Sequence, residues 1–71
     1  MGLSARNQFA GTVLSIKGGA VMSEVVLDVG GLQIVSLIST SSAKRLRLRK
    51  GARAVAVIKA TEVIISTDDQ L

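Results

Sequence analysis

The segment Leu32–Ser39 carries apolar side chains on both of its faces, with Ile34 and Ile38 on one side and Val35 and Leu37 on the other. Successive side chains of an extended strand point to opposite faces. Strands that are apolar on both faces normally belong to a sheet that is covered on both sides. Because a single small barrel cannot cover its own outside, we expect copies of this chain to pack on one another. The outer residues expected to be buried in this way are Val26, Val35 and Leu37.

The small size of the chain also favours association. A domain of 71 residues buries only about 60% of the surface that its unfolded chain exposes. Small scaffolds usually add disulfides, a structural metal or oligomerisation. The sequence has no Cys and no His, so the first two are difficult to build and oligomerisation remains. We expect one domain, residues 1–71, that acts as a homo-oligomer.

Val, Ile, Leu and Ala provide almost all of the apolar content, since Phe9 is the one aromatic residue. This composition favours strands, and alternation between Gly-rich turns predicts an all-β fold. Gly11 is expected to be a bulge or bend in the first strand, and Gly30-Gly31 a two-residue hairpin turn. The hydroxyls of residues 39–42 are natural N-caps for a helix that ends before Gly51. The expected elements are strands at 5–16, 21–29 and 32–39, a helix at 43–48, and strands at 54–60 and 62–66, the last two being one bent strand or a tight pair.

This order matches a small OB-type barrel of five strands, in which a helix often plugs the barrel between the third and fourth strands.

The missing residue types exclude most catalytic chemistry. Without His or Cys there is no imidazole base, thiolate nucleophile or soft-metal site, and a hydroxyl nucleophile would need activation by Lys or a carboxylate. The five acidic residues have no spacing typical of a paired general acid and base or of a calcium loop. No segment approaches the roughly 20 apolar residues that span a bilayer, and the start does not resemble a secretory signal. We expect a cytoplasmic binding protein that is neither an enzyme nor a membrane protein.

Positive charge is concentrated in one segment. The net charge is +4, and six of the nine Lys and Arg residues lie between residues 44 and 53, a segment that we call the basic run. The basic run is either a solvated face or a surface that attracts anions in general.

Anion-binding groups are abundant in this chain. A tetrahedral oxyanion needs opposite charge and several hydrogen-bond donors, which Arg6, Lys59, hydroxyl groups and Gly-rich turns can supply. Each candidate also has a simpler interpretation, which the residues alone leave open. Arg6 is then a solvated side chain, Lys59 an edge-strand charge, and Ser39 and Ser42 helix caps.

Five short motifs, taken together, resemble those of one known family. They are SARNQ from Ser4, GTV from Gly11, EVVLDVGG from Glu24, ISTSS from Ile38 and IKAT from Ile58. In this order and spacing the chain resembles the molbindins, cytoplasmic molybdate- and tungstate-binding proteins of the Mop family, whose domain is also called TOBE-type. The resemblance implies an OB-like fold assembled into a hexamer, as a trimer of dimers, with molybdate or tungstate as the ligand and neither an organic cofactor nor a bare metal cation.

The resemblance also implies which residues hold the oxyanion. Ser4 and Arg6 would contact it, and Ala5 would contribute backbone. Lys59 would add its ammonium and Ala60 its backbone N–H, while the hydroxyls of Ser39 and Ser42 would come from the neighbouring subunit. A second class of oxyanion site is expected at a turn whose backbone N–H groups converge on a symmetry axis, formed by Lys17, Gly18, Gly19, Ala20 and Val21.

One departure from the family pattern is visible after the expected helix. Family members have a Leu-Gly-Leu-like stretch there, whereas this chain reads Leu46-Arg47-Leu48 and continues into further charges. The helix end is therefore not fixed by the motif, and the added charge leaves open a role beyond storage.

Two other functions are weighed against intracellular storage of molybdate or tungstate. A nucleic-acid-binding OB-type module would use the basic run, but such modules usually stack bases on aromatic side chains, and this chain offers Phe9 alone. A sensing module of a larger transcription factor or transporter is the other. We expect a free-standing oxyanion carrier with no nucleic-acid partner.

Overall fold

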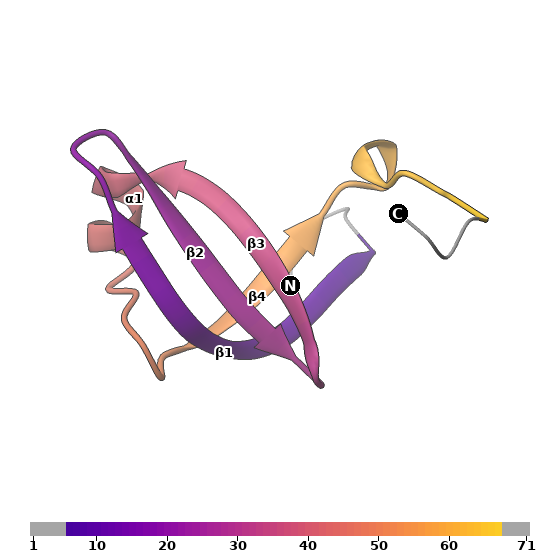
Figure 1. The fold of residues 1–71 in the computed structure, drawn as a ribbon, viewed down its shortest axis with the longest axis horizontal. Coiled ribbons are helices and arrows are strands. Elements are labelled where there is room, and N and C mark those ends of the chain that lie inside the picture. The colour runs from indigo at the N-terminus through magenta and orange to yellow at the C-terminus, as the bar shows by residue number, and fades with distance from the viewer. Residues whose placement is uncertain (1–5, 68–71) are drawn as a thin grey trace.

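The structure is a computed structural model that describes residues 6–67. It contains an antiparallel sheet with the strand order β3-β2-β1-β4 and one short helix (Figure 1). No helix in this part of the chain is long and apolar enough to cross a bilayer. The elements are β1 (Asn7–Gly18), β2 (Met22–Val29), β3 (Leu32–Ser39), α1 (Thr40–Arg45), β4 (Arg53–Ile58) and a 3₁₀ turn η1 (Ala60–Glu62).

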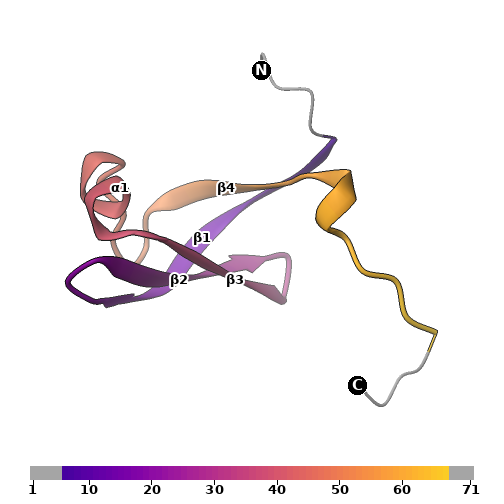
Figure 2. The same cartoon turned by 90° about the horizontal axis from the view of Figure 1, so that it is seen from above.

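Strand β1 curls the sheet because it is shared by two partners. Its first half pairs with β4 and its second half with β2, and Thr12 is opposite both Arg53 and Asp28. The register between β1 and β2 shifts between Val13 and Ser15, and such a β-bulge bends a strand and increases its twist. The result is a half-barrel rather than a flat sheet (Figures 1 and 2).

A bulge or bend was predicted at Gly11, and the register shift of the bulge lies further along β1, between Val13 and Ser15. Gly11 lies beside the point where β1 changes partners, and a Cβ atom there would collide with the backbone carbonyl of Asp28 and lie 2.7 Å from Cγ1 of Val29. Glycine is needed at this position because β2 approaches closely, and not because β1 has an extra residue there.

The core lies on the concave side of the half-barrel. Val13, Val25 and Leu27 are buried there, as the alternation of the second strand predicted. The outer face of β3 is uncovered, since Val35 is 60% and Leu37 is 67% exposed. In residues 6–67 the buried apolar side chains are these three and Ala43 of α1, which is a small core for a chain of this length.

Helix α1 begins earlier than predicted. Residues 43–48 were expected, but the helix spans Thr40–Arg45 with Ser39 as its N-cap, whose Oγ accepts a hydrogen bond from the N–H of Ser42. Residues 40–42 therefore form the first turn of the helix instead of preceding it. The single capping oxygen of Ser39 is enough to start the helix.

The end of α1 explains the departure from the family pattern. The N–H groups of Arg47 and Leu48 donate to the carbonyls of Lys44 and Ala43 at 3.0 and 3.1 Å, which is the Schellman arrangement that ends many helices. Arg47 follows the helix with a φ of 55°, in the left-handed region that favours Gly. The Gly of the family's Leu-Gly-Leu stretch would suit this position, which Arg47 occupies here.

Other differences from the predicted elements are at strand ends. The first strand ends at Gly18 rather than residue 16, the second begins at Met22, and β4 spans Arg53–Ile58 rather than 54–60. The predicted turn at Gly30-Gly31 is present, and both glycines have positive φ.

The strand predicted at 62–66 is absent. Residues 60–62 form η1 and residues 63–67 have no regular structure. Figures 1 and 2 show this segment leaving the body of the sheet. None of the four strands that the structure describes pairs with residues 62–66, so the predicted fifth strand is not formed within residues 6–67.

Replacing Arg47 by Gly should raise the free energy of unfolding by about 1 kcal/mol, because the left-handed conformation costs an L-residue about that much. Chemical denaturation at one fixed protein concentration measures the change. Arg49→Gly is the matched control, since among the described non-glycine residues Arg47 alone has positive φ. An equal effect of the two substitutions would show that Arg47 is not strained.

Candidate functional site

Arg6 and Lys59 are brought to the same end of the sheet by the pairing of β1 with β4. Asn7 is opposite Ile58 in this antiparallel ladder, so the residue before Asn7 and the residue after Ile58 are neighbours. Both Arg6 and Lys59 are exposed. Ser4 and Ala5, the other predicted ligands from this end of the chain, lie outside the described residues.

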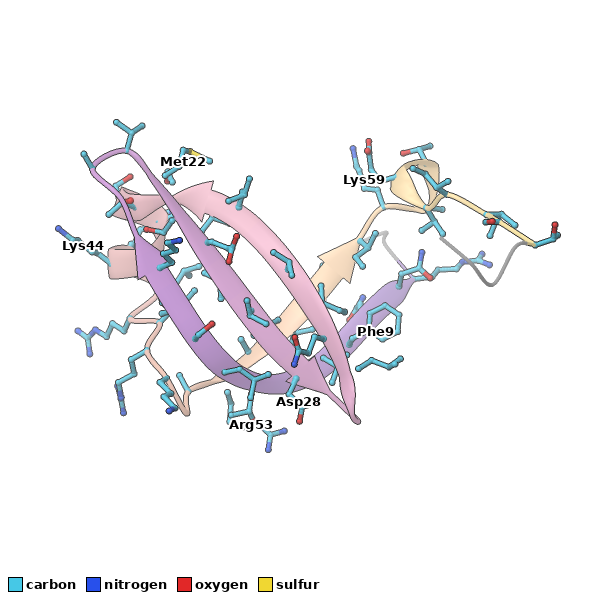
Figure 3. All side chains as sticks on the ribbon, viewed as in Figure 1. Phe9, Met22, Asp28, Lys44, Arg53 and Lys59 are labelled. Atoms are coloured by element: carbon cyan, nitrogen blue, oxygen red, sulfur yellow. The ribbon has the colours of Figure 1, made fainter. Side chains whose placement is uncertain are left out.

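Lys59 and Ala60 stand where β4 passes into η1. Lys59 is the N-cap residue, and its carbonyl accepts the N–H of Glu62 at 2.9 Å. Ala60 is the first residue of η1, and the first N–H groups of a helical turn have no carbonyl partner within it. Lys59 and Ala60 are thus consecutive residues at the start of η1, and their roles as oxyanion ligands stay predictions. Figure 3 shows the Lys59 side chain extending from this end of the molecule.

Ser39 and Ser42 form a hydroxyl cluster at the start of α1. Ser39 Oγ accepts the N–H of Ser42 at 3.1 Å and donates to Ser42 Oγ at 2.7 Å. Ser41 Oγ is 3.3 Å from Ser39 Oγ, and Ser41 must be the donor there because Ser39 has a single proton. Ser39 is thus fully used as a cap and acceptor.

Ser42 keeps one donor for a ligand. Its oxygen accepts from Ser39 Oγ at 2.7 Å and from Nη2 of Arg45 at 3.3 Å, and its own proton has no acceptor within residues 6–67. Of the two predicted hydroxyl ligands, Ser42 is the one that can donate to an anion without breaking the cap of α1.

The two halves of the predicted site lie at opposite ends of the half-barrel. Ser39 is opposite Met22 at one end of the sheet, whereas Asn7 and Ile58 are opposite each other at the other end. Figure 3 shows the same separation, with Met22 and Lys44 at one end and Lys59 at the other. One copy therefore brings Arg6 and Lys59 together, but does not bring them to Ser39 and Ser42.

The turn predicted as a second site is tied firmly to α1. Thr40 Oγ1 donates to the carbonyl of Gly19 at 2.7 Å, and the N–H of Thr40 donates to Val21 at 2.7 Å. The N–H of Gly19 is already bonded to the carbonyl of Met22, and Lys17 and Gly18 belong to β1. A second oxyanion site formed with Ala20 stays a prediction, without the Gly19 amide as a donor.

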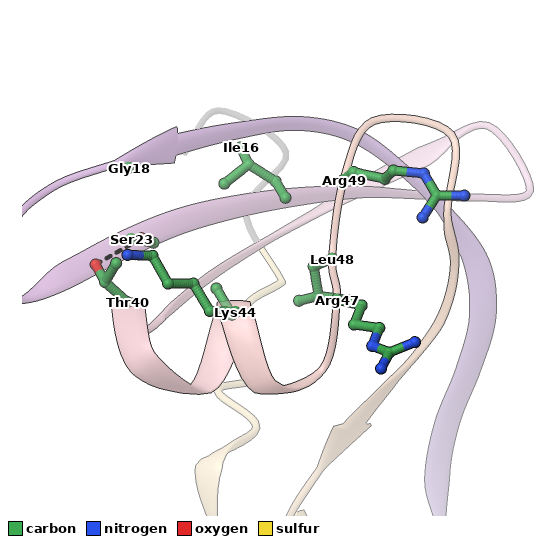
Figure 4. A pocket seen from close by; sticks show the side chains of 9 residues that line it. Ile16, Gly18, Ser23, Thr40, Lys44, Arg47, Leu48 and Arg49 are labelled. Carbon is green, nitrogen blue, oxygen red and sulfur yellow. Dashed lines mark hydrogen bonds between the residues drawn. The ribbon is translucent and has the colours of Figure 1, made fainter.

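A basic pocket beside α1 was not foreseen. Its volume is about 460 Å³, and its lining includes Lys44, Arg47 and Arg49. Figure 4 shows Lys44 reaching toward Ser23 and Thr40, with the two arginines beyond Leu48. Thr40 Oγ1 donates its proton to the carbonyl of Gly19 and accepts a hydrogen bond from Oγ of buried Ser23. Neither hydroxyl therefore has a proton left for a ligand. The spacing of the basic residues on the predicted helix was the signal that could have indicated this pocket. The helix begins earlier than predicted, however, so different side chains share one face.

Comparison with known proteins places this geometry in a family. A family model for the TOBE domain matches residues 3–65. The chain belongs to the TOBE-domain family. The resemblance to Mop proteins that the five motifs indicated is thereby confirmed.

Relatives that match this chain in sequence are named for molybdenum. Molybdenum-pterin-binding protein 1 of Clostridium pasteurianum is 47% identical over 66 residues, which are 92% of this chain and 97% of the relative. The molybdenum transport protein ModE of Herbaspirillum seropedicae is 45% identical over 69 residues, which are 96% of this chain. The chain spans 26% of the length of that ModE protein.

Solved structures of similar sequence have the same fold. MopII from Clostridium pasteurianum matches with a TM-score of 0.86 at 46% identity, covering 90% of this chain and 97% of that one. A molybdate binding protein from Sporomusa ovata matches with a TM-score of 0.88 at 36% identity, covering 93% and 98%. The cytoplasmic molybdate-binding protein ModG, with molybdate bound, matches at 0.82 and 44% identity, covering 84% of this chain and 43% of ModG.

Ser39→Ala should lower the free energy of unfolding by about 1 kcal/mol, because it removes the N-cap of α1. Ser41→Ala is the control, since Ser41 only donates a long hydrogen bond to Ser39 and its loss should have a smaller effect. Denaturant unfolding followed by far-ultraviolet circular dichroism measures both. If the two variants were equally stable, Ser39 would not be the cap.

Proposed function

We propose that this chain binds molybdate and tungstate at sites formed between its copies, and stores or buffers these oxyanions in the cytoplasm without catalysing a reaction. The observation that carries the proposal is the division of the donors. Arg6, Lys59 and Ala60 lie at one end of the half-barrel and Ser42 at the other, in a chain whose relatives are named for molybdenum. Two copies can close one anion site that a single copy leaves open.

The donor set suits an anion that only accepts hydrogen bonds. A guanidinium, an ammonium, a backbone N–H and the Ser42 hydroxyl supply positive charge and donors of different directions. A molybdate dianion presents four oxygens and no proton. Tungstate has the same charge and shape, so these groups would bind both.

The second copy also has a place to dock. A groove of about 620 Å³ opens between β3 and β4, where its lining includes Ile34, Ile38 and Ala56. This is the gap that the fifth strand of an OB-type barrel would fill. We propose that residues 63–65 of a second copy fill it.

The exposed C-terminal segment supports this exchange. Ile64 is 92% and Ile65 is 82% exposed, and apolar side chains of this size gain about 1.5–3 kcal/mol each when fully buried. Because the segment follows Ala60 closely, the exchange would carry Lys59 and Ala60 toward the second copy. Pairs joined in this way would assemble further into the proposed hexamer, a trimer of dimers.

Nucleic-acid binding is not favoured. The relatives are named for molybdenum and molybdate, and the single aromatic residue Phe9 provides no platform for stacked bases.

Isothermal titration should give a dissociation constant below about 100 μM for molybdate and for tungstate, which corresponds to about −5.5 kcal/mol. Sulfate and phosphate, titrated under the same conditions, are the comparison anions. If neither molybdate nor tungstate reached this affinity, storage would be untenable.

Lys59→Gln should weaken molybdate binding by about tenfold, because it removes a charged donor at the anion. Lys50→Gln removes the same charge from the basic run, where salt screens it, and should change the affinity much less. Equal losses in the two variants would remove Lys59 from the site.

A further inference from the structure

Arg45 contacts Ser42, which among the described hydroxyls of the candidate site, Ser39 and Ser42, is the one with a free proton. Its Nη2 donates to Ser42 Oγ at 3.3 Å. The two residues are three apart on α1, the spacing that brings side chains together on one helix face. The resemblance to the family assigned no role to Arg45, which belongs to the basic run.

This contact completes the hydrogen bonds that Ser42 Oγ can accept. A Ser hydroxyl has one proton and two lone pairs. Ser39 Oγ–H and Arg45 Nη2–H occupy both lone pairs. Ser42 can therefore only donate to a ligand, and its proton has no acceptor within residues 6–67 that would compete for it.

We infer that Arg45 is a positioning residue of the oxyanion site, which holds Ser42 as a pure donor and so selects fully deprotonated oxyanions against protonated ones. The inference rests on the proposed function, because it concerns the same site. Molybdate matches such a donor, since every oxygen accepts. Hydrogen phosphate carries one P–O–H group that itself needs an acceptor, and a hydroxyl without a free lone pair cannot provide it.

Charge alone cannot make this distinction. At mildly alkaline pH molybdate and hydrogen phosphate are both dianions, so the field of the basic run attracts both nearly equally. The difference between them is the proton. A group that fixes the donor direction of Ser42 therefore changes the ratio of the two affinities, whereas a distant cation changes both by the same factor.

The experiment compares Arg45→Ala with Arg49→Ala at mildly alkaline pH. Arg49 belongs to the same basic run and has the same charge, but it makes no hydrogen bond to Ser42 within the described residues. Titration calorimetry gives the affinity for molybdate, and competition against molybdate gives the affinity for hydrogen phosphate. Arg45→Ala should lower the ratio of molybdate to hydrogen phosphate affinity by at least about fivefold, and Arg49→Ala should leave the ratio unchanged.

A double-mutant cycle tests whether Arg45 acts through Ser42. Groups that act through one another have effects that do not add. In the Ser42→Ala protein, Arg45→Ala should therefore no longer change the ratio. Far-ultraviolet circular dichroism checks that each variant keeps α1.

Two results would overturn the inference. Equal losses for both anions in Arg45→Ala would show that Arg45 contributes only charge, and an unchanged effect in the Ser42→Ala protein would show that it does not act through Ser42. Failure of the unmodified protein to bind molybdate would instead refute the proposed function itself, and the inference with it.

Discussion

The curl of the sheet around β1 is the constraint on which the other features depend. One strand pairs with β4 along its first half and with β2 along its second, and the close approach at Gly11 together with the bulge after Val13 makes the bend possible. The curl stops at four strands, so the concave face stays open between β3 and β4. An apolar groove and an exposed apolar C-terminal segment are the two consequences, and each is suited to cover the other in a second copy.

The same geometry places the candidate ligand groups at opposite ends of the half-barrel. Because β1 runs the length of the half-barrel, the charged donors beside its first residue are far from the hydroxyls at the start of α1. The hydroxyls are not equivalent either. Ser39 caps the N-terminus of α1, while Ser42 keeps a proton that it can donate. In the proposed site, folding and binding would thus use neighbouring atoms of one short segment, and the bond from Arg45 joins Ser42 to the basic run.

Local patterns in the sequence predicted local structure well. Strand β3 was predicted with its observed bounds, and the paired glycines at residues 30 and 31 gave the hairpin, because alternation and positive φ are properties of a few adjacent residues. Helix α1 was misplaced because several hydroxyls in a row can each cap a helix, and only the folded chain selects Ser39. The fifth strand was predicted from residues that are apolar but pair with none of the described strands of their own chain. The role of Arg45 depends on hydrogen-bond directions that no residue pattern contains. The contributions of all the predicted ligands, Ser4 and Ala5 included, stay predictions.

Native mass spectrometry of the molybdate-loaded protein tests most directly whether fold and binding both require a second copy. The expected result is a hexamer with six times the 7.4 kDa mass of the chain, carrying molybdate, from which dissociated monomers emerge without the anion. Deleting residues 63–65 should abolish the assembly and the bound molybdate together. A 7.4 kDa monomer that retains molybdate with undiminished affinity would contradict a site shared between copies.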